Sequence, residues 1–366
     1  MSAVPAGIET PEVLIDRDIL ERNIDRMATA VRAKGIDLRP HVKTHKMPEI
    51  ASRQLAAGAV GLTVATIGEA EVFVQHGARD VFIAYPLWVT PHHARRLAEL
   101  GSLARVAVGT DSVEAAQAMG AALSDATDRI EVLVEIDSGH HRSGVSPSHA
   151  VEVAESAAAA GLRVSGVFTF PGHSYAPGMP VKAAEQEHFA LEEAASLLRS
   201  AGFDISRISG GSTPTAALAV QSSANEVRPG VYVFGDAQQL ELGRCTLDEI
   251  ALTIAATVVS RHQGAGSTPR RCVLDAGSKI IGSDRPAWAS GFGRLMDYPE
   301  ARISALSEHH ATVIWPDGSE LPALGARLRV IPNHVCLTMN LVDEATVVSG
   351  DAVIARWRVD ARGKNN

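Results

Sequence analysis

Strand-like and helix-like segments alternate through the first two thirds of the chain, and this alternation limits the fold more than any other feature. Apolar, β-branched runs that predict strands end near residues 43, 65, 85, 108, 136, 170, 209 and 233. Runs that predict helices lie at about 16–34, 48–57, 68–75, 91–100, 112–123, 147–160 and 181–201, with a short one after Thr213. This pattern predicts a parallel (β/α)8 barrel of the TIM type. A doubly wound open sheet is the alternative, but it would normally carry a glycine-rich phosphate turn after its first strand, and none is there.

The pattern changes near Leu240. Short β-branched runs separated by Gly, Pro, Asp and Asn follow, at 250–260, 271–274, 301–306, 311–315, 327–331, 346–348 and 353–357. Helical periodicity is nearly absent, so these runs predict a separate β domain. We therefore expect an α/β plus β fold with three parts. Residues 1–16 form a segment that pairs with the β domain, residues 17–240 form the barrel, and residues 241–366 form the C-terminal β domain.

Composition narrows the classes of function. The formal net charge of -8 argues against nucleic-acid binding, and no apolar run approaches the roughly 18 residues of a membrane helix. The N-terminus lacks the basic flank and apolar core of a signal peptide. The three cysteines are odd in number and far apart, which argues against a disulfide framework and for a reducing compartment. We expect a cytoplasmic protein that binds a small molecule.

Residues 39–46, Arg-Pro-His-Val-Lys-Thr-His-Lys, concentrate cations at the predicted end of the first strand. A solvated surface run is the ordinary explanation, but such runs seldom mix His, Thr and Pro with Lys. Lysines at strand ends are often covalent catalysts. Arg39, His41 and Lys43 alternate, so on a strand they would share the inward face. Lys43 is therefore the candidate Schiff-base lysine; Lys46 is a weaker one, and a structural role for both is the alternative.

Polar residues follow most of the predicted strands, at the end of a barrel where active sites lie. They include Thr66, Tyr85, Arg142, His173, Tyr175, Tyr232 and Asp236. After the seventh strand, the turn Gly210-Gly211-Ser212-Thr213 leads into a predicted helix, and its backbone N–H groups and hydroxyls predict an anion site. Phosphates in barrels favour the loops after strands seven and eight, which makes Tyr232 a further candidate. A phosphate site opposite a strand-end lysine points to pyridoxal 5'-phosphate, whose aldehyde needs a lysine amine.

A second cluster lies in the predicted β domain. His334 and Cys336 are two residues apart, so on a strand their side chains would point to the same side. Together they are candidate ligands for one divalent metal, with Zn²⁺ favoured and Mn²⁺ or another ion as the alternative. A buried cysteine beside a hydrogen-bonded histidine is the ordinary explanation of such a pair.

Several motifs together resemble a known family. They are residues 39–46, Gly172-His173-Ser174-Tyr175, Asp275-Ala276-Gly277-Ser278-Lys279 and Pro332-Asn333-His334-Val335-Cys336. They are similar to motifs of the eukaryotic-type D-serine dehydratase and D-threonine aldolase family of fold-type III pyridoxal phosphate enzymes, and the resemblance covers nearly the whole chain. It implies an alanine-racemase-like barrel with a C-terminal β domain, Lys43 linked to the cofactor, a divalent metal at His334 and Cys336, and a homodimer.

The resemblance also implies one of two reactions on D-3-hydroxy amino acids. Dehydratases of the family resemble this chain in carrying His-x-Cys at the metal, whereas aldolases carry His-x-Asp. Cys336 therefore favours dehydration to a 2-oxo acid and ammonia over retro-aldol cleavage to glycine and an aldehyde. In both reactions Lys43 is the expected base for the Cα proton, and Arg142 is expected to bind the cofactor. His173 is a candidate base, and His41, Tyr85 and Tyr175 are candidate substrate contacts.

The chain departs from the family pattern at two positions. Phe168 and Phe170 stand where members often have Tyr and His, which removes two polar groups near the cofactor.

Three other classes of protein are alternatives. An amino-acid racemase would share the barrel and Lys43 but would have no need for His334 and Cys336. A non-catalytic pyridoxal phosphate carrier is usually a barrel alone, and a cofactor-free scaffold protein would lack the absorbance of the cofactor.

Overall fold

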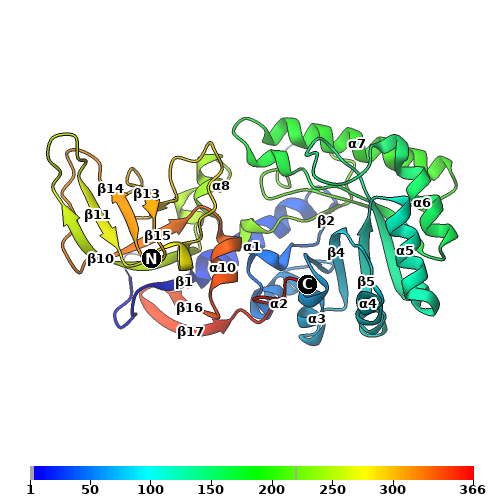
Figure 1. Cartoon of the computed structure of the whole chain (residues 1–366), viewed down its shortest axis with the longest axis horizontal. Helices are drawn as coiled ribbons and strands as arrows, with labels where there is room; N and C mark the ends of the chain where they lie inside the picture. Colours follow the sequence, from blue (N-terminus) through cyan, green and yellow to red (C-terminus); the bar gives the residue numbers. More distant parts are fainter. Residues whose placement is uncertain (1–3, 219–220) are drawn as a thin grey trace. The chain divides into compact units, whose positions relative to one another are not determined.

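The computed structural model describes residues 4–218 and 221–366, which fall into two compact units (Figure 1). The barrel unit comprises residues 26–43, 50–230 and 363–366. The β unit comprises the described residues up to 25, together with 44–49 and 231–362. The division between the two units therefore passes through the cation-rich segment 39–46, between Lys43 and Thr44.

Eight parallel strands form the sheet of the barrel unit, in the order β2-β9-β8-β7-β6-β5-β4-β3. They are β2 (Asp37–Leu38), β3 (Leu62–Val64), β4 (Asp80–Pro86), β5 (Arg105–Thr110), β6 (Ile130–Glu135), β7 (Arg163–Phe168), β8 (Arg207–Gly210) and β9 (Glu226–Val227). At the two edges a parallel bridge joins His41 to Thr63, and the Thr63 N–H donates to the Pro40 carbonyl at 2.9 Å. The first and last strands of the sheet thus meet. The predicted (β/α)8 topology is confirmed, and the doubly wound alternative is wrong.

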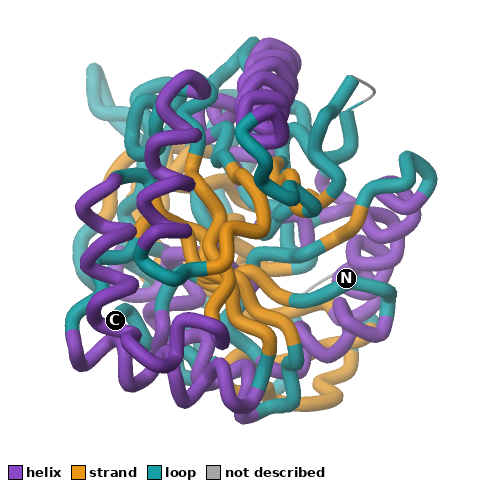
Figure 2. The backbone as a smooth tube through the Cα atoms, turned by 90° about the vertical axis from the view of Figure 1, so that its right-hand side faces the viewer, coloured by secondary structure: helices purple, strands orange, loops and turns teal. Residues whose placement is uncertain are grey.

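Helices alternate with these strands and lie outside the sheet (Figure 2). They are α1 (Arg17–Arg32), α2 (Pro48–Ala56), α3 (Ile67–Gln75), α4 (Pro91–Leu103), α5 (Val113–Leu123), α6 (Ala150–Ala159) and α7 (Pro180–Ser200). Local sequence fixes where several of them begin, since the hydroxyls of Thr66, Thr90 and Ser112 accept the N–H three residues later. The expected helix after Thr213 is wrong: the chain there forms a turn in which the Thr215 N–H donates to the Ser212 carbonyl at 3.1 Å.

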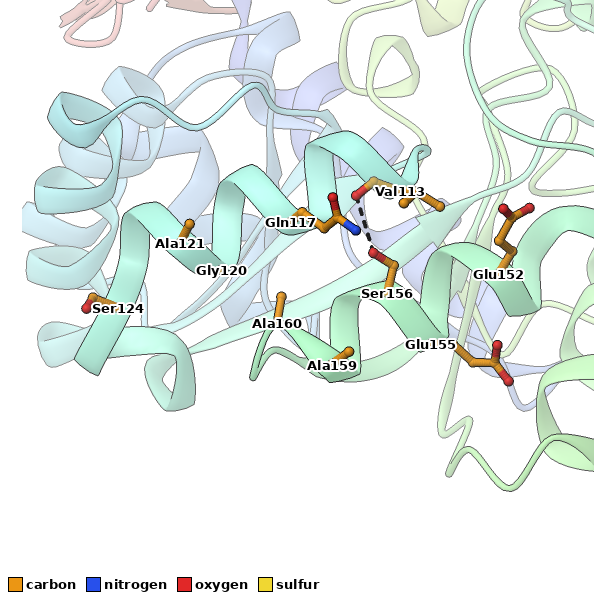
Figure 3. Close-up of a pocket in the computed structure, with 10 residues that line it drawn as sticks. All are labelled: Val113, Gln117, Gly120, Ala121, Ser124, Glu152, Glu155, Ser156, Ala159 and Ala160. Carbon is orange, nitrogen blue, oxygen red and sulfur yellow. Dashed lines mark hydrogen bonds between the residues drawn. The ribbon is translucent and has the colours of Figure 1, made fainter.

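Small residues bring α5 and α6 close together. A Cβ on Gly120 would overlap the carbonyl oxygen of Ala160, so only glycine fits there. Across the same contact the Ser156 hydroxyl donates to the Val113 carbonyl at 3.3 Å (Figure 3). A depression of about 800 Å³ runs between the two helices. Contacts of this kind show how a chain with only 4% aromatic residues packs its helices, by close approach rather than by large side chains.

A closed ring of alternating charges lies at the end of the barrel where its strands begin. In order round the ring its members are Arg39, Asp80, Arg105, Glu131, Arg207 and Glu226, each ion-paired with the next. The shortest N–O distances, 2.6 Å, join Arg39 to Asp80 and to Glu226. Arg39 and Glu226 are buried. Removing one partner would leave a buried charge uncompensated, so the ring stabilises the barrel only when it is complete.

Acid is expected to weaken this ring. Burial alone would raise the pKa of Glu226, but Arg39, Arg207 and the Ser209 hydroxyl outweigh it and lower that pKa from 4.5 to about 2. A carboxylate whose pKa is lowered by folding contributes stability that is complete above its unfolded pKa and is lost as the pH falls through the folded value. Here the loss amounts to about 3 kcal/mol. The free energy of unfolding in urea should therefore fall more steeply for wild type than for Glu226→Gln as the pH is lowered from neutral to about 2.

The matched control for this prediction is Glu308→Gln. Glu308 is an exposed carboxylate that pairs with Lys279 at 3.0 Å. Its removal should leave the wild-type dependence on pH intact, because exposed pairs contribute little. A difference between wild type and Glu226→Gln that stays constant across the whole pH range would contradict the proposed contribution of the ring.

Nine strands form the sheet of the β unit, in the order β11-β14-β13-β12-β15-β10-β1-β16-β17. They are β1 (Glu12–Asp16), β10 (Leu252–His262), β11 (Arg271–Leu274), β12 (Gly293–Leu295), β13 (Arg302–Leu306), β14 (Ala311–Ile314), β15 (Arg327–Pro332), β16 (Glu344–Ser349) and β17 (Ala352–Arg358). β10 also pairs with β11, so β10 to β15 close on themselves. β1 pairs antiparallel with β10 and parallel with β16.

Three short helices interrupt the β unit: α8 (Ala237–Glu241), α9 (Ser278–Ile281) and α10 (Val335–Leu341). None of these helices was predicted from the sequence, and neither was β12. Each of these elements is too short to show a helical or strand-like hydrophobic periodicity. Over the described ranges, no helix combines the length and apolarity needed to cross a membrane.

Candidate active site

Lys43 lies just beyond the first strand of the barrel rather than on it. β2 ends at Leu38, and Lys43 occupies the 3-10 turn Val42–Thr44. The expected strand through Lys43 is therefore wrong, and so is the inward alternation argued from it. Pro40 explains the early end of the strand, because it has no N–H with which to continue the ladder. Its carbonyl instead accepts the N–H of Thr63.

Lys43 nevertheless lines a cavity of about 510 Å³ in the barrel unit. The wall consists of His41, Lys43, Ala65, Thr66, Ala84, Tyr85, Pro86, Asp111, Arg142 and Ser143. These residues lie at or beyond the carboxyl ends of their strands, where barrel active sites are built. The structure thus brings five of the predicted residues to one cavity, namely His41, Lys43, Thr66, Tyr85 and Arg142.

The two lysines of segment 39–46 have different surroundings. The Lys43 amine lies 5.8 Å from the ring centre of Phe170, and among the described residues it has no hydrogen-bond or ion-pair partner. Lys46 is buried, has a positive φ of 56°, and donates through its amine to the Asn340 side-chain oxygen at 2.8 Å. The contrast leaves the Lys43 amine available for chemistry and gives Lys46 a contact within the β unit.

Phe168 and Phe170 both contact cations. Phe170 is half-buried, and the Arg142 guanidinium lies 5.0 Å from its ring centre, so the ring faces both Arg142 and Lys43. Phe168 is fully buried and meets Phe82 edge-on at 5.1 Å between ring centres. The rings of Phe170 and Phe168 therefore provide faces for cations, in the case of Phe168 for the Arg228 guanidinium at 5.5 Å.

Arg228 is a buried cation that the sequence reasoning missed. Its guanidinium lies 5.5 Å from the ring centre of Phe168 and donates to the Ser209 hydroxyl and the Thr169 carbonyl, both at 2.5 Å. Burial lowers the pKa of Arg228 to about 10, against the raising effect of nearby carboxylates. Arg228 directly follows β9 (Glu226–Val227), but the last strand was predicted to continue to residue 233, so the sequence reasoning placed Arg228 inside that strand.

Two acids near the cavity were also missed. Asp111 directly follows β5, lines the cavity, and accepts the Gly144 N–H at 3.0 Å, which holds the loop that carries Arg142. Glu135 ends β6 and is buried, and burial raises its pKa in spite of the neighbouring Ser143 and Arg142. Both acids lie at the carboxyl ends of barrel strands. The same criterion identified the other candidate residues from the sequence.

His173 and Tyr175 lie on the Gly172–Tyr175 turn and are not among the residues that line the cavity of Lys43. The His173 ring stacks on His140 at 6.4 Å, and its Nε2 pairs with the Gln186 side-chain oxygen at 3.0 Å. Tyr175 packs against Phe170 at 6.2 Å between ring centres. Tyr175 thus packs against the same ring, Phe170, that faces Lys43 and Arg142.

The Gly210–Thr213 turn is less open than its sequence predicted. The Gly211 N–H donates to the Glu187 carboxyl group at 2.8 Å, and the Ser212 N–H donates to the Thr215 hydroxyl at 2.9 Å. Two of the expected free N–H groups thus have partners. A Cβ on Gly210 would overlap Oε1 of Glu187, so a larger residue there would force the Glu187 side chain to move.

Glu187 is a buried acid whose carboxyl group contacts this turn. Burial raises the pKa of Glu187 to about 7, against the lowering effects of the Gly211 N–H and Arg228. When protonated, the carboxyl group is compatible with an anion at the turn; when ionised, it repels one. Tyr232, the other predicted phosphate ligand, is buried in the 3-10 turn Val231–Val233 of the β unit.

His334 and Cys336 lie at the start of a helix, so the expected strand geometry is wrong for this pair. β15 ends at Pro332, and His334 precedes the first residue of α10. The two side chains still interact: burial lowers the pKa of His334, but Cys336 and Asp284 outweigh it and raise that pKa well above its ordinary value. The Cys336 thiol also donates to the Thr44 hydroxyl at 3.3 Å. In the described part of the chain, no group of three or more His, Cys, Asp or Glu side chains is arranged to hold a metal.

Two protein families match successive parts of the chain. Residues 15–238 match the alanine racemase N-terminal domain, and residues 251–348 match a serine dehydratase domain. The chain belongs to the alanine-racemase-like, fold-type III family of pyridoxal phosphate enzymes. The first match alone covers more than half of its length, and the family inferred from the motifs is confirmed.

Relatives within this fold-type III family match over nearly the whole chain. D-threo-3-hydroxyaspartate dehydratase from Delftia sp. (strain HT23) is 35% identical over 376 residues, which cover 96% of this chain and 97% of the relative. D-threonine aldolase from Arthrobacter sp is 32% identical over 366 residues, which cover 98% of this chain and 94% of the relative. The family therefore includes both a dehydratase and an aldolase.

Solved structures of the family are equally similar. D-threo-3-hydroxyaspartate dehydratase, solved as a cysteine-to-alanine variant in the metal-free form, matches with a TM-score of 0.87 at 33% identity. The match covers 96% of this chain and 97% of the other. The alanine-racemase-like barrel followed by a β domain is therefore the fold that the motifs implied.

Proposed function

We propose that this chain is a pyridoxal phosphate- and divalent metal-dependent lyase that acts on D-3-hydroxy amino acids. Its proposed main reaction is dehydration to a 2-oxo acid and ammonia. The observation that carries the proposal is the Lys43 amine, which lines the cavity and has no hydrogen-bond or ion-pair partner among the described residues. In the proposal Lys43 holds the cofactor, Arg142 contacts it, and His334 and Cys336 hold the metal.

The residues around Lys43 fit pyridoxal phosphate. An amine without a partner is accessible to an aldehyde, and a cavity of about 510 Å³ has the size of a small-molecule site. Arg142 adds a positive charge that suits an anionic ligand. The Gly210–Thr213 turn is the proposed phosphate site, and a protonated Glu187 makes it compatible with that charge.

The His334 and Cys336 side chains fit a divalent metal. An imidazole nitrogen and a thiolate are ligands that Zn²⁺ prefers, which supports zinc over Mn²⁺. Two protein ligands leave coordination positions open for substrate, as in catalytic rather than structural sites. The metal-free form of a cysteine variant in the related dehydratase supports the same role for Cys336.

When bound, pyridoxal phosphate supplies an aldehyde and an electron-withdrawing ring, and the metal supplies a Lewis acid. Lys43 is proposed to take the Cα proton of the substrate. The Phe170 ring beneath its amine stabilises the resulting ammonium ion. Asp111 holds Gly144 and thereby keeps the loop of Arg142 in place. His41 and Tyr85, on the same cavity wall, are the proposed substrate contacts, whereas His173 and Tyr175 stay predictions.

Cys336 favours dehydration over aldol cleavage. By resemblance, dehydratases of the family carry His-x-Cys at the metal and aldolases carry His-x-Asp, and this chain has Cys at the second position. The dehydratase relative is also slightly more similar to the chain than the aldolase, at 35% against 32% identity. Retro-aldol cleavage to glycine and an aldehyde is the second candidate, because the same lysine and metal serve both reactions.

Product analysis tests the proposed reaction. We expect the purified protein to release ammonia and a 2-oxo acid from D-serine, D-threonine or D-threo-3-hydroxyaspartate, and to lose this activity when a chelator removes the metal. Glycine and an aldehyde from D-threonine or D-phenylserine as main products would assign the chain to the aldolases. Interconversion of D- and L-amino acids without cleavage would indicate a racemase. A protein without the visible absorbance of a lysine-linked cofactor would contradict the whole proposal.

Two further properties are part of the proposal. A homodimer is proposed from the family resemblance, and sedimentation at micromolar concentration tests it. A cytoplasmic location is proposed because Cys245, Cys272 and Cys336 are all outside disulfide bonds in the structure, as expected in a reducing compartment.

A further inference from the structure

Asp284 bonds to one of the two proposed metal ligands. Its Oδ2 lies 2.7 Å from Nδ1 of His334. A carboxylate in this position accepts a hydrogen bond from the N–H at Nδ1, which favours the neutral tautomer in which Nε2 carries a lone pair. Nε2 is then the ring nitrogen that is available to a metal. Both side chains are partly exposed, at 49% for Asp284 and 34% for His334, so the pair itself adds little to stability.

The segment that carries Asp284 is fastened to the segment of His334 by contacts on both sides. The buried Asn333 side chain donates from Nδ2 to the Asp284 carbonyl at 3.0 Å and to the Gly291 carbonyl at 2.7 Å. From within α10, the Thr338 hydroxyl donates to the Ile281 carbonyl at 2.9 Å. Residues 281–291 and α10 are therefore held in a fixed relation to each other.

Gly282 closes this contact further. Its φ is +84°, and a Cβ would lie 2.8 Å from Cδ2 of Leu337. Only glycine combines this backbone conformation with such close packing. The backbone two residues before Asp284 thus packs closely against α10, which fixes where the Asp284 side chain begins relative to His334.

We propose that Asp284 is a positioning residue for the metal site: it orients the His334 imidazole so that Nε2 faces the metal beside Cys336. The inference rests on the proposed function only in that His334 and Cys336 are taken as the ligands. Asp284 is not itself a ligand in this proposal, because its Oδ2 is already engaged with Nδ1 of His334.

Metal titration tests this role independently of catalysis. The dissociation constant for Zn²⁺ is measured by competition with a chromophoric chelator, using metal-stripped protein. We expect Asp284→Ala to bind Zn²⁺ about 10- to 100-fold more weakly than wild type. Asp284→Asn should restore most of the affinity, because its amide oxygen can still accept the Nδ1 proton. Asp343→Ala is the matched control, since Asp343 also lies in the β unit and pairs with the side chain of Arg362 at 2.6 Å.

Each outcome has a distinct meaning. Unchanged Zn²⁺ affinity in Asp284→Ala would overturn the positioning role while leaving the proposed function intact. An equal loss in Asp284→Asn and Asp284→Ala would also overturn it, because a carboxylate that ligates the metal directly loses its charge in both variants. If wild type binds no metal, or if His334→Ala and Cys336→Ala bind it as tightly as wild type does, then His334 and Cys336 are not metal ligands. That result would contradict the metal site of the proposed function, whatever the role of Asp284. The melting temperature of each metal-free variant shows that the fold is kept.

Discussion

Replacing Lys43 with alanine is expected to abolish covalent attachment of the cofactor and to reduce the rate of the lyase reaction by about 10³-fold or more. Both effects have one cause, because the amine that binds the aldehyde is also the proposed base for the Cα proton. The loss of the visible absorbance of the lysine-linked cofactor measures the first effect, and steady-state release of 2-oxo acid measures the second. The cavity itself should persist, since Lys43 has no hydrogen-bond or ion-pair partner among the described residues to lose.

The control for this prediction lies three residues further along the chain. Lys46→Met should keep the absorbance, although it gives up the contact with Asn340 and is expected to melt at a lower temperature. Borohydride reduction of the wild type, followed by peptide mass spectrometry, gives an answer that does not depend on any variant. Attachment at Lys46 instead of Lys43 would show that the wrong lysine has been assigned.

The second large effect is expected at the metal pair. Cys336→Ala or His334→Ala should lose the metal and reduce dehydration by about 10²- to 10³-fold, because hydroxide is a poor leaving group without a Lewis acid. The lysine-linked cofactor should remain, because neither His334 nor Cys336 is among the residues that line the cavity of Lys43. Metal content by atomic emission, cofactor absorbance and product release separate the two centres in one set of measurements.

Cys245→Ala is the matched control for the metal pair. Cys245 is another half-buried cysteine of the β unit that is not in a disulfide, and no role in metal binding is proposed for it. Its variant should keep both metal and activity. Full dehydration activity in protein from which all metal has been removed would defeat the assignment of His334 and Cys336.

Much of the fold could be predicted from the sequence because long helices and strands show a clear hydrophobic periodicity. The helix predicted over 181–201 appears as Pro180–Ser200, and the strand predicted over 271–274 appears as Arg271–Leu274. The errors occur where a local event outweighs the pattern. Pro40 ends β2 early, so the alternation argument for Lys43 used a strand that does not extend so far.

The candidate site was predictable at the level of residues but not of contacts. Polar residues at strand ends identified Lys43, Tyr85 and Arg142, and the same rule applied to acids would have added Asp111. Arg228 was missed because the last strand ends at Val227, well before its predicted end at residue 233. Contacts made by residues far apart in sequence give no local signal. The bond from Gly211 to Glu187, which reduces the openness of the expected anion site, spans 24 residues and could only come from the folded chain. The bond from Asp284 to His334 spans 50 residues and was missed for the same reason.

The ring of charges at the end of the barrel where its strands begin also limits which substitutions this sequence can accept during evolution. Each member touches two neighbours of opposite sign, so a single inversion of charge creates two repulsive contacts at once. Tolerated changes must therefore come as compensated sets, and the effect of any one depends on the residues already present at the others. Arg39 is a member of this ring and stands four positions before Lys43 without lining its cavity. The effect of a substitution in the ring thus depends on a residue of segment 39–46, which also bears Lys43. Arg39 belongs to that segment because of its ion pairs in the ring and not because of the reaction.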